Sequence, residues 1–206
     1  MAEVPEQYAH ARFVSSVARL AQLPEDGAVE VAFAGRSNAG KSSALNVIAG
    51  QRGLARISKT PGRTRLINLF EIGAGRRLVD LPGYGYAKVP ESTRRDWEVL
   101  LAGYLERRRT LAGVILVLDA RRGVTDLDRR LLELITPNRV GVHVLLTKAD
   151  KLGRGASAHA LDEARRALEQ LGVEATLQLF SATRRTGLED VHGILDTWFA
   201  GGADGT

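Results

Sequence analysis

One stretch of the sequence has the composition and spacing of a phosphate-binding loop. Residues 35–42 read GRSNAGKS, which fits the pattern GxxxxGK[ST], and they lie between an apolar run and a segment of helical character. Glycines at these places let backbone N–H groups face a β-phosphate, a lysine adds positive charge between the β- and γ-phosphates, and the following serine hydroxyl reaches Mg²⁺. The alternative is a glycine turn with a lysine at a helix start, which the flanking pattern disfavours. The predicted phosphate-binding residues are Gly35, Arg36, Ser37, Asn38, Ala39, Gly40, Lys41, which also acts in catalysis, and Ser42.

A second group of residues could sense the γ-phosphate. Asp80 ends an apolar run and is followed by Leu81, Pro82 and Gly83. A carboxylate there can hold a Mg²⁺-bound water, and Gly83 lets a main-chain N–H approach the γ-phosphate without a side chain in the way. The pattern DxxG is weak alone and gains weight after a phosphate-binding loop. Tyr84 stands next, where phosphate-dependent switches often carry a glutamine that orients the attacking water, so we expect slow intrinsic hydrolysis.

The base of the nucleotide is predicted from a carboxylate after a later apolar run. Residues 144–150 read VLLTKAD, and Asp150 can accept hydrogen bonds from both N1–H and the exocyclic amine of guanine. Adenine offers no such pair of donors. The stem of Lys148 could lie over the ring, and backbone N–H groups of residues 180–182 could meet the guanine O6; the alternative is a charged loop with Asp150 as a helix cap. The predicted base-binding residues are Thr147, Lys148, Ala149, Asp150, Phe180, Ser181 and Ala182.

Short apolar runs alternate with segments of helical period along the chain, and they must bring these loops together. Such alternation predicts an α/β fold in three layers, with a six-stranded, mostly parallel sheet covered on both faces by helices. Residues 73–75 separate two of the runs, which predicts a hairpin that adds one antiparallel edge strand. In such a sheet, ligands bind at the carboxyl ends of the strands, where the motifs above lie. The predicted strands are 29–34, 66–72, 76–80, 114–119, 142–147 and 176–180, and the predicted helices are 13–20, 41–48, 94–109, 126–135, 161–171 and 188–199.

Length and composition limit the number of domains, the cellular compartment and the class of partner. A chain of 206 residues with 44% hydrophobic residues can form one domain with a full core, which we assign to residues 26–200, after an arm at residues 1–25 and before a flexible tail at residues 201–206. The absence of cysteine excludes disulfides and agrees with a reducing compartment, the cytoplasm. The longest uncharged apolar run, residues 111–118, is too short to cross a membrane. A net charge of +5 predicts a polyanionic partner such as nucleic acid, unless it marks only a solvated basic surface.

Five segments, taken together and in order, resemble a known family. GRSNAGKSS, SKTPGRT, DLPGYGYA, TKAD and FSA are similar to the motifs of the EngB (YihA/YsxC) family of bacterial ribosome-assembly GTPases, which are Ras-like P-loop GTPases. The resemblance covers roughly residues 10–200. It implies a Ras-like fold, binding of GTP or GDP with Mg²⁺, hydrolysis of GTP, and a role in assembly of the large (50S) ribosomal subunit, with a link to cell division and septation.

The resemblance also assigns the first switch to residues 51–65, where Thr64 would reach Mg²⁺. Reasoning from the residues alone leaves Thr60 as an alternative, in a loop longer than usual connections. The basic residues of this loop contact RNA phosphates or are simply solvated. Thr147 stands where asparagine is commoner in GTPases, so we expect fewer contacts to loop and base and modest nucleotide affinity. The resemblance adds Gly62, Arg63, Thr64, Arg65 and Leu66 to the nucleotide site, Thr64 and Gly83 to catalysis, and Ser42, Thr64 and, through water, Asp80 to the metal site.

Three further residues carry open alternatives. Asn38 could hold a monovalent cation such as K⁺ beside the phosphates, or merely cap its loop. Tyr84 and Tyr86 could stack on rRNA bases or on a protein partner, or pack within their own loop. The expected partner is the large ribosomal subunit or its precursors, met by a monomer and without a membrane. A ribosome-binding chaperone, in which GTP mainly orders the switches, and a small P-loop kinase or ATPase are the competing interpretations.

Overall fold

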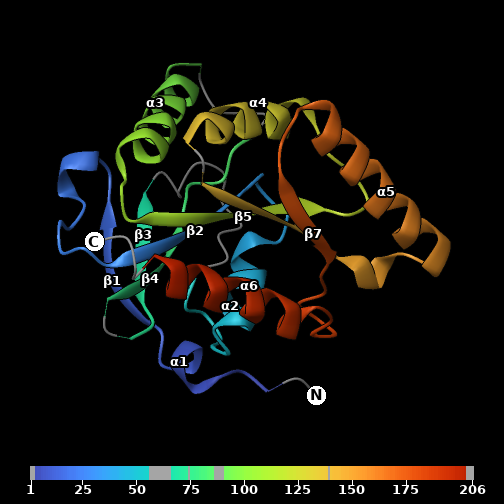
Figure 1. Ribbon diagram of the computed structural model, residues 1–206, viewed down its shortest axis with the longest axis horizontal. Helices are drawn as coiled ribbons and strands as arrows, with labels where there is room; N and C mark the ends of the chain where they lie inside the picture. The colour runs from blue at the N-terminus through green and yellow to red at the C-terminus, as the bar shows by residue number, and fades with distance from the viewer. Residues whose placement is uncertain (1–2, 56–65, 74, 86–90, 139, 203–206) are drawn as a thin grey trace.

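The computed structural model describes residues 3–55, 66–73, 75–85, 91–138 and 140–202, and in this part of the chain one seven-stranded sheet lies between two layers of helices (Figure 1). The strand order is β1-β3-β4-β2-β5-β6-β7. The strands are β1 (Arg12–Val17), β2 (Val29–Gly35), β3 (Ile67–Glu71), β4 (Arg76–Asp80), β5 (Leu111–Asp119), β6 (Gly141–Thr147) and β7 (Ala175–Leu179). The helices are α1 (Glu6–Ala9), α2 (Lys41–Ile48), α3 (Glu91–Arg107), α4 (Asp126–Ile135), α5 (Arg154–Gln170) and α6 (Leu188–Gly201), with short 3₁₀ turns at Leu20–Gln22, Thr136–Asn138 and Ala149–Lys151.

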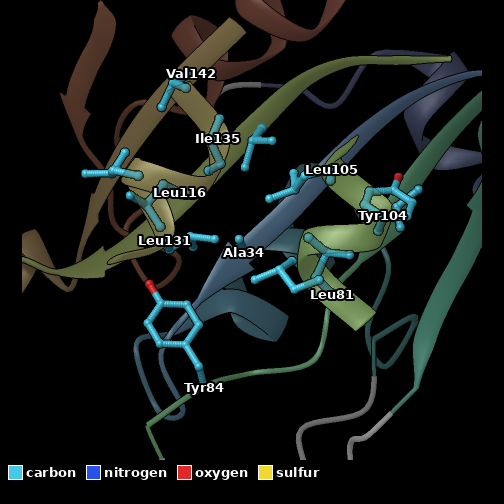
Figure 2. Close-up of a cluster of buried hydrophobic side chains, with 14 of the residues drawn as sticks. Ala34, Leu81, Tyr84, Tyr104, Leu105, Leu116, Leu131, Ile135 and Val142 are labelled. Atoms are coloured by element: carbon cyan, nitrogen blue, oxygen red, sulfur yellow. The ribbon is translucent and has the colours of Figure 1, made fainter. Parts of the chain in front are cut away.

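The central strands are apolar along their whole length because both faces of the sheet are covered. In β2, Ala32 and Ala34 join the apolar cluster under α3, α4 and α5, which Figure 2 shows in part. Val31 and Phe33 of the same strand point the other way and join the cluster under α1, α2 and α6. From β4 to β7, through β2, β5 and β6, all the pairings are parallel, so the carboxyl ends of these strands share one edge of the sheet.

Most of the predicted elements are confirmed, including the α/β class, the mostly parallel sheet, and α2 and α4 with the predicted bounds. The predicted start of α5 at residue 161 is late, since the helix begins at Arg154. Its first six residues, 154–159, are largely exposed, so they show no apolar face from which a helix could be predicted. Among the described residues, no helix is long and apolar enough to cross a membrane.

The predicted helix at residues 13–20 is wrong, because this segment contributes β1. β1 pairs antiparallel with β3, with Arg12 opposite Glu71 and Ser16 opposite Asn68. Aromatic and β-branched residues in this segment suit a strand, and the hydrogen bonds to β3 decide between the two structures. The sheet therefore has seven strands rather than six. Its edge strand is β1, while β3, which we expected at the edge, lies between β1 and β4, pairs antiparallel with both and runs against the other six strands.

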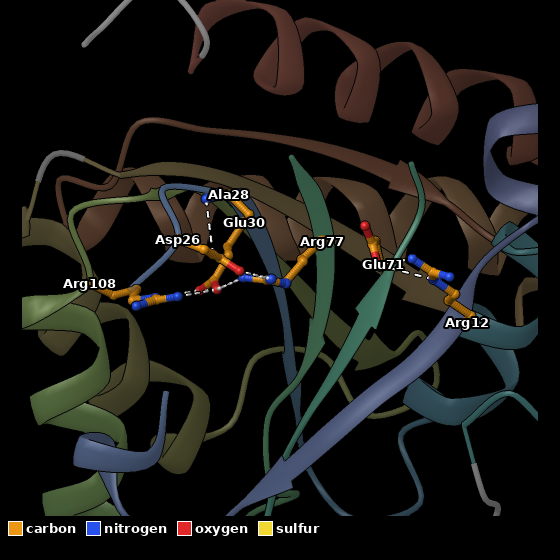
Figure 3. Close-up of polar contacts among 7 residues, drawn as sticks. All are labelled: Arg12, Asp26, Ala28, Glu30, Glu71, Arg77 and Arg108. Carbon is orange, nitrogen blue, oxygen red and sulfur yellow. Dashed lines mark hydrogen bonds and ion pairs between the residues drawn. The ribbon is translucent and has the colours of Figure 1, made fainter. Parts of the chain in front are cut away.

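A buried ion network holds α3 to the amino-terminal end of β2 (Figure 3). The Glu30 side chain is fully buried and accepts hydrogen bonds from Nε and Nη2 of Arg108, at 2.8 and 2.6 Å, and from the hydroxyl of Tyr104 at 2.8 Å. Arg77 lies 3.9 Å from the same carboxylate and also pairs with Asp26. Burial raises the pKa of Tyr104 well above its usual value, so its hydroxyl stays a donor. This network stands at the opposite end of β2 from the phosphate-binding loop.

Replacing Glu30 with alanine should lower the free energy of unfolding by about 3–5 kcal/mol, because Arg108 and Tyr104 then lose a buried partner. The matched control is Arg12→Ala, which removes the ion pair with Glu71 from an Arg12 side chain that is 75% exposed. An exposed pair is worth at most about 1 kcal/mol, so this variant should remain close to wild type. Urea denaturation followed by far-UV circular dichroism measures both. An equal loss in the two variants would contradict the role given to Glu30.

Candidate functional site

The phosphate-binding loop lies where the sequence predicts it, between the end of β2 at Gly35 and the start of α2 at Lys41. Two glycines allow this loop to pack closely against its neighbours. A Cβ on Gly35 would lie 2.6 Å from the carbonyl oxygen of Val117, so only glycine lets β2 and β5 come this close. Gly40 has a φ of 102°, a backbone conformation that favours glycine, and a Cβ there would lie 3.3 Å from the Thr147 hydroxyl.

The predicted lysine and the predicted acid meet at the centre of the site. The Nζ of Lys41 forms an ion pair with Oδ1 of Asp80, and their side chains are only 8% and 4% exposed. Asp80 ends β4, which is paired with β2 in the sheet, so the sheet register itself brings the carboxylate to the loop. The second oxygen, Oδ2, lies 3.5 Å from the side-chain amide of Asn68. Lys41 and Asp80 are 39 residues apart in sequence, and they form one polar centre in the fold.

The residues of this centre suit Mg²⁺. Carboxylate and hydroxyl oxygens are the donors that Mg²⁺ accepts, and it is commonly held by one or two carboxylates together with phosphate oxygens of the substrate. Asp80 supplies the carboxylate, and Ser42 follows Lys41 in the first turn of α2. The described residues contain no cluster of three or more His, Cys, Asp or Glu that could form an all-protein cage. The side chains therefore fit a metal that is shared with a bound phosphate chain.

The base-binding loops also come together. The hydroxyl of Ser181 donates to Oδ1 of Asp150 at 2.7 Å, and the Nζ of Lys151 lies 3.5 Å from Oδ2. The hydrogen bond from Ser181 is the main cause that holds the pKa of Asp150 below its usual value, so the group is an ionised acceptor at neutral pH. The backbone N–H of Ala149 donates to the carbonyl of Phe180 at 3.2 Å. These contacts place the segment after β6 beside the segment after β7, as expected.

Two residues join the base-binding segment to the phosphate-binding loop. Lys148, at a φ of 60°, donates from Nζ to the carbonyl oxygen of Asn38 at 2.6 Å. The Thr147 hydroxyl contacts the carbonyl oxygen of Ala39 and lies 2.8 Å from that of Leu118. Although threonine is shorter than the commoner asparagine, it still reaches the loop. The side chain of Asn38 is exposed, and its own role stays a prediction.

Tyr84 is part of the core, at 5% exposure, and is not a surface residue (Figure 2). Its hydroxyl donates to Oδ1 of Asp128 in α4 at 2.5 Å, and its ring lies 5.3 Å from that of Trp97. Its carbonyl accepts the N–H of Ser37 at 2.7 Å. Burial raises the pKa of Tyr84 well above its usual value. The expectation that Tyr84 stacks on rRNA bases is therefore wrong; it packs locally and ties the loop after Asp80 to the phosphate-binding loop.

Several predicted residues lie outside the described part of the chain. These are Thr60, Gly62, Arg63, Thr64, Arg65 and Tyr86. Leu66 precedes β3, and Leu81, Pro82 and Gly83 follow β4. The Trp97 indole N–H donates to the carbonyl of Pro82 at 2.9 Å, so α3 also holds the segment that follows Asp80, for which contact with the γ-phosphate stays a prediction.

Asp119, a buried acid at the end of β5, lies beside the site and was not among the predicted residues. It accepts hydrogen bonds from Nε of Arg121 at 2.9 Å and from Nζ of Lys148 at 2.9 Å. Burial alone would raise its pKa, but these donors hold the pKa of Asp119 well below its usual range. The signal that could have found it is the one used for Asp80, a carboxylate that directly ends an apolar run.

The chain is similar to GTP-binding proteins over most of its length. Residues 30–148 match the model of a family described as 50S ribosome-binding GTPase. The probable GTP-binding protein EngB of Coxiella burnetii is 49% identical over 192 residues, which cover 93% of this chain and 94% of that protein. The protein of the same name from Nitrosococcus oceani is 52% identical over 191 residues, covering 93% of this chain and 96% of that protein.

Two solved structures share the fold. The crystal structure of a probable GTP-binding protein EngB superimposes with a TM-score of 0.68 at 20% identity, covering 84% of this chain and 99% of that one. Era, in complex with MgGDPNP and nucleotides 1506–1542 of 16S ribosomal RNA, superimposes with a TM-score of 0.62 at 21% identity, covering 82% of this chain and 56% of that one. The arrangement of strands and helices is thus one that GTP-binding proteins use.

Replacing Asp150 with asparagine should weaken GTP binding at least about 100-fold, because two charge-assisted hydrogen bonds to guanine are lost and each is worth about 1.5–3 kcal/mol. Affinity for xanthosine triphosphate should rise, since xanthine presents an acceptor where guanine has its amine. Titration with fluorescent analogues of both nucleotides measures this change. Asp126→Asn, an exposed position at the start of α4, is the matched control. An unchanged preference for GTP would show that Asp150 does not read the base.

Proposed function

The chain belongs to the EngB family of GTP-binding proteins, which are GTPases, and from that premise we propose that it is a GTP-hydrolysing switch that acts in assembly of the large (50S) ribosomal subunit. One observation carries the proposal: the phosphate-binding loop, Asp80 and the Asp150–Ser181 pair meet at one edge of the sheet. That edge presents a lysine for phosphates, an acid suited to Mg²⁺ and an ionised acceptor for guanine. The family description supports a ribosomal partner.

GTP would bind along this edge with its base at Asp150 and its phosphates in the loop 35–42. Lys41 would then contact the β- and γ-phosphates, so its ion pair with Asp80 would be exchanged for phosphate oxygens. Ser42 and Thr64 would hold Mg²⁺ directly, and the freed carboxylate of Asp80 would hold it through a bound water; the positive charge of the metal would offset the charge of the phosphates. Gly83 would offer its N–H to the γ-phosphate. GTP binding thereby changes the partner of Asp80 and, through it, the segment that reaches Tyr84.

Slow intrinsic hydrolysis follows from the position of Tyr84. Its hydroxyl is engaged by Asp128, it has no amide, and its side chain is buried among α3 and α4. It therefore cannot orient an attacking water as a glutamine does. The missing stabilisation would come from a partner, from a monovalent cation held by Asn38, or from both. An assembly chaperone in which hydrolysis is incidental is the alternative function, and subunit-stimulated turnover separates the two.

We predict that the protein co-sediments with large subunits, and not with small subunits, in a non-hydrolysable GTP analogue, and much less in GDP. The large subunit should also raise GTP turnover, because it would supply groups that the site lacks. Phosphate release and sedimentation through a sucrose cushion measure these effects. Binding without stimulation would favour the chaperone. Equal binding to both subunits in both nucleotides would contradict the switch. The link to cell division, the cytoplasmic location and the monomeric state stay predictions.

A potassium dependence tests the role of Asn38. If its side chain holds K⁺ beside the phosphates, turnover in KCl should exceed turnover in NaCl at equal ionic strength, with or without large subunits, because Na⁺ is smaller. Asn38→Asp and Asn38→Ala would separate charge from coordination. Equal rates in the two salts would leave Asn38 as a loop residue only.

A further inference from the structure

A pocket of about 410 Å³ lies between the phosphate-binding loop, the end of β5 and the start of α4. Its walls include Arg36 and Ser37 from the loop, Asp119 from β5, Arg122 from the turn that follows, and Asp128 from α4. Four residues central to the nucleotide site do not line it: Lys41, Ser42, Asp80 and Asp150. Residues 36–39 and Lys148, by contrast, line the pocket and also belong to the predicted nucleotide site, so the pocket adjoins that site and shares one wall with it.

The carboxylates of this pocket already have their partners. Asp119 accepts four hydrogen bonds, from the backbone N–H, Nε and Nη2 of Arg121 and from Nζ of Lys148, between 2.7 and 3.1 Å. Asp128 accepts the hydroxyl of Tyr84 at 2.5 Å and both the N–H and the hydroxyl of Thr125, at 2.8 and 2.6 Å. A carboxylate has about four acceptor positions, so little capacity is left for a cationic ligand.

Three donors of the pocket, by contrast, are unused among the described residues, whereas Arg121, Thr125 and Lys148 donate to its two carboxylates. Within the described part of the chain, the side chains of Arg36 and Arg122 have no hydrogen bond or ion pair, and the buried Ser37 hydroxyl has no partner either. Arg36 is half-buried in the wall, and Arg122 is exposed at the rim. Each guanidinium offers donors in a planar fork and always carries its charge. Because the free groups of this pocket are donors and its acceptors are already paired, the ligand that fits it is an anion that only accepts hydrogen bonds.

We propose that this pocket receives a phosphodiester unit of large-subunit ribosomal RNA, an inference that rests on the ribosomal partner of the proposed function. Arginine pairs with phosphate in a bidentate manner. The cavity volume falls within the about 300–1,000 Å³ of ordinary ligand sites, so a sugar can enter with its phosphate, over the Val117 and Leu118 part of the wall. A single carboxylate from an acidic protein would fill little of this space. The net charge of +5 also favours a polyanion.

The position of the pocket couples RNA to the nucleotide. Residues 36–39 form one wall of the pocket and also belong to the loop that receives the phosphates of GTP. Lys148 spans the two as well, because it contacts Asp119 in the pocket and the carbonyl of Asn38 in the loop. If RNA binding favours one arrangement of this loop, GTP affinity changes by the same factor that GTP applies to RNA affinity.

The test compares Arg122→Ala with Arg166→Ala, which removes an exposed arginine from α5, away from the pocket. Binding to large subunits is measured by sedimentation in a non-hydrolysable GTP analogue over a series of KCl concentrations. We expect Arg122→Ala to weaken binding about 3- to 10-fold and to reduce the salt slope by about 1, as loss of one phosphate contact does. Arg166→Ala should match wild type. Arg122→Lys should recover part of the affinity, since it restores the charge but not the fork.

Each other outcome overturns the inference in a recognisable way. If wild type binds large subunits and the two alanine variants behave alike, the pocket is not a phosphate site, while the proposed function stands. If wild type does not bind large subunits in any nucleotide state, both proposals fail. A second series on protein-free large-subunit RNA should reproduce the loss for Arg122→Ala. A loss on intact subunits alone would mean that the pocket receives an acidic protein side chain, and RNA as the occupant would be wrong.

Discussion

The ion pair between Lys41 and Asp80 is the interaction on which the site depends. Taking two charges out of water costs several kcal/mol for each, so such a pair persists only where its surroundings hold both groups in place. Here the sheet does so, because β2 leads into the loop before Lys41 and β4 ends at Asp80, and the two strands are neighbours. A phosphate chain offers Lys41 an alternative partner of the same charge as Asp80. In the proposed complex with GTP, the contact between Lys41 and phosphate would offset the free energy lost when Lys41 separates from Asp80.

The segment after Asp80 is fastened at three points. Trp97 holds the carbonyl of Pro82, Asp128 holds the hydroxyl of Tyr84, and the N–H of Ser37 holds the carbonyl of Tyr84. These contacts connect the segment to α3, α4 and the phosphate-binding loop. A tyrosine in place of glutamine thus exchanges a group that could orient water for one that fixes the backbone. In the proposed function, the groups that complete hydrolysis would come from beyond these residues.

Much of the site could be predicted because each motif directly follows an apolar run, and parallel strands bring their carboxyl ends together whatever their order in the chain. Gly35 and Gly40 mark the turn from strand to helix in the sequence, because a side chain at either position would be too close to its neighbours.

β1 could not be predicted in the same way. Its Phe13 is 57% exposed and its Val14 is 41% exposed, and only Val17 of the strand is buried, so the segment shows no period of two in burial. Pairing with the distant strand β3 makes it a strand. Asp119 also directly follows an apolar run, but it belongs to no short motif such as DxxG, and its contacts with Arg121 and Lys148 are seen only in the folded chain.

The network around Glu30 has a mechanical consequence for α3. Seventeen residues long, this helix extends about 25 Å. The contacts of Tyr104 and Arg108 secure its far end to the base of β2, while Trp97, nearer its beginning, donates to the carbonyl of Pro82 after β4. The same helix therefore joins the ion network at the base of β2 to the segment that follows Asp80, although these two regions lie at opposite ends of the sheet.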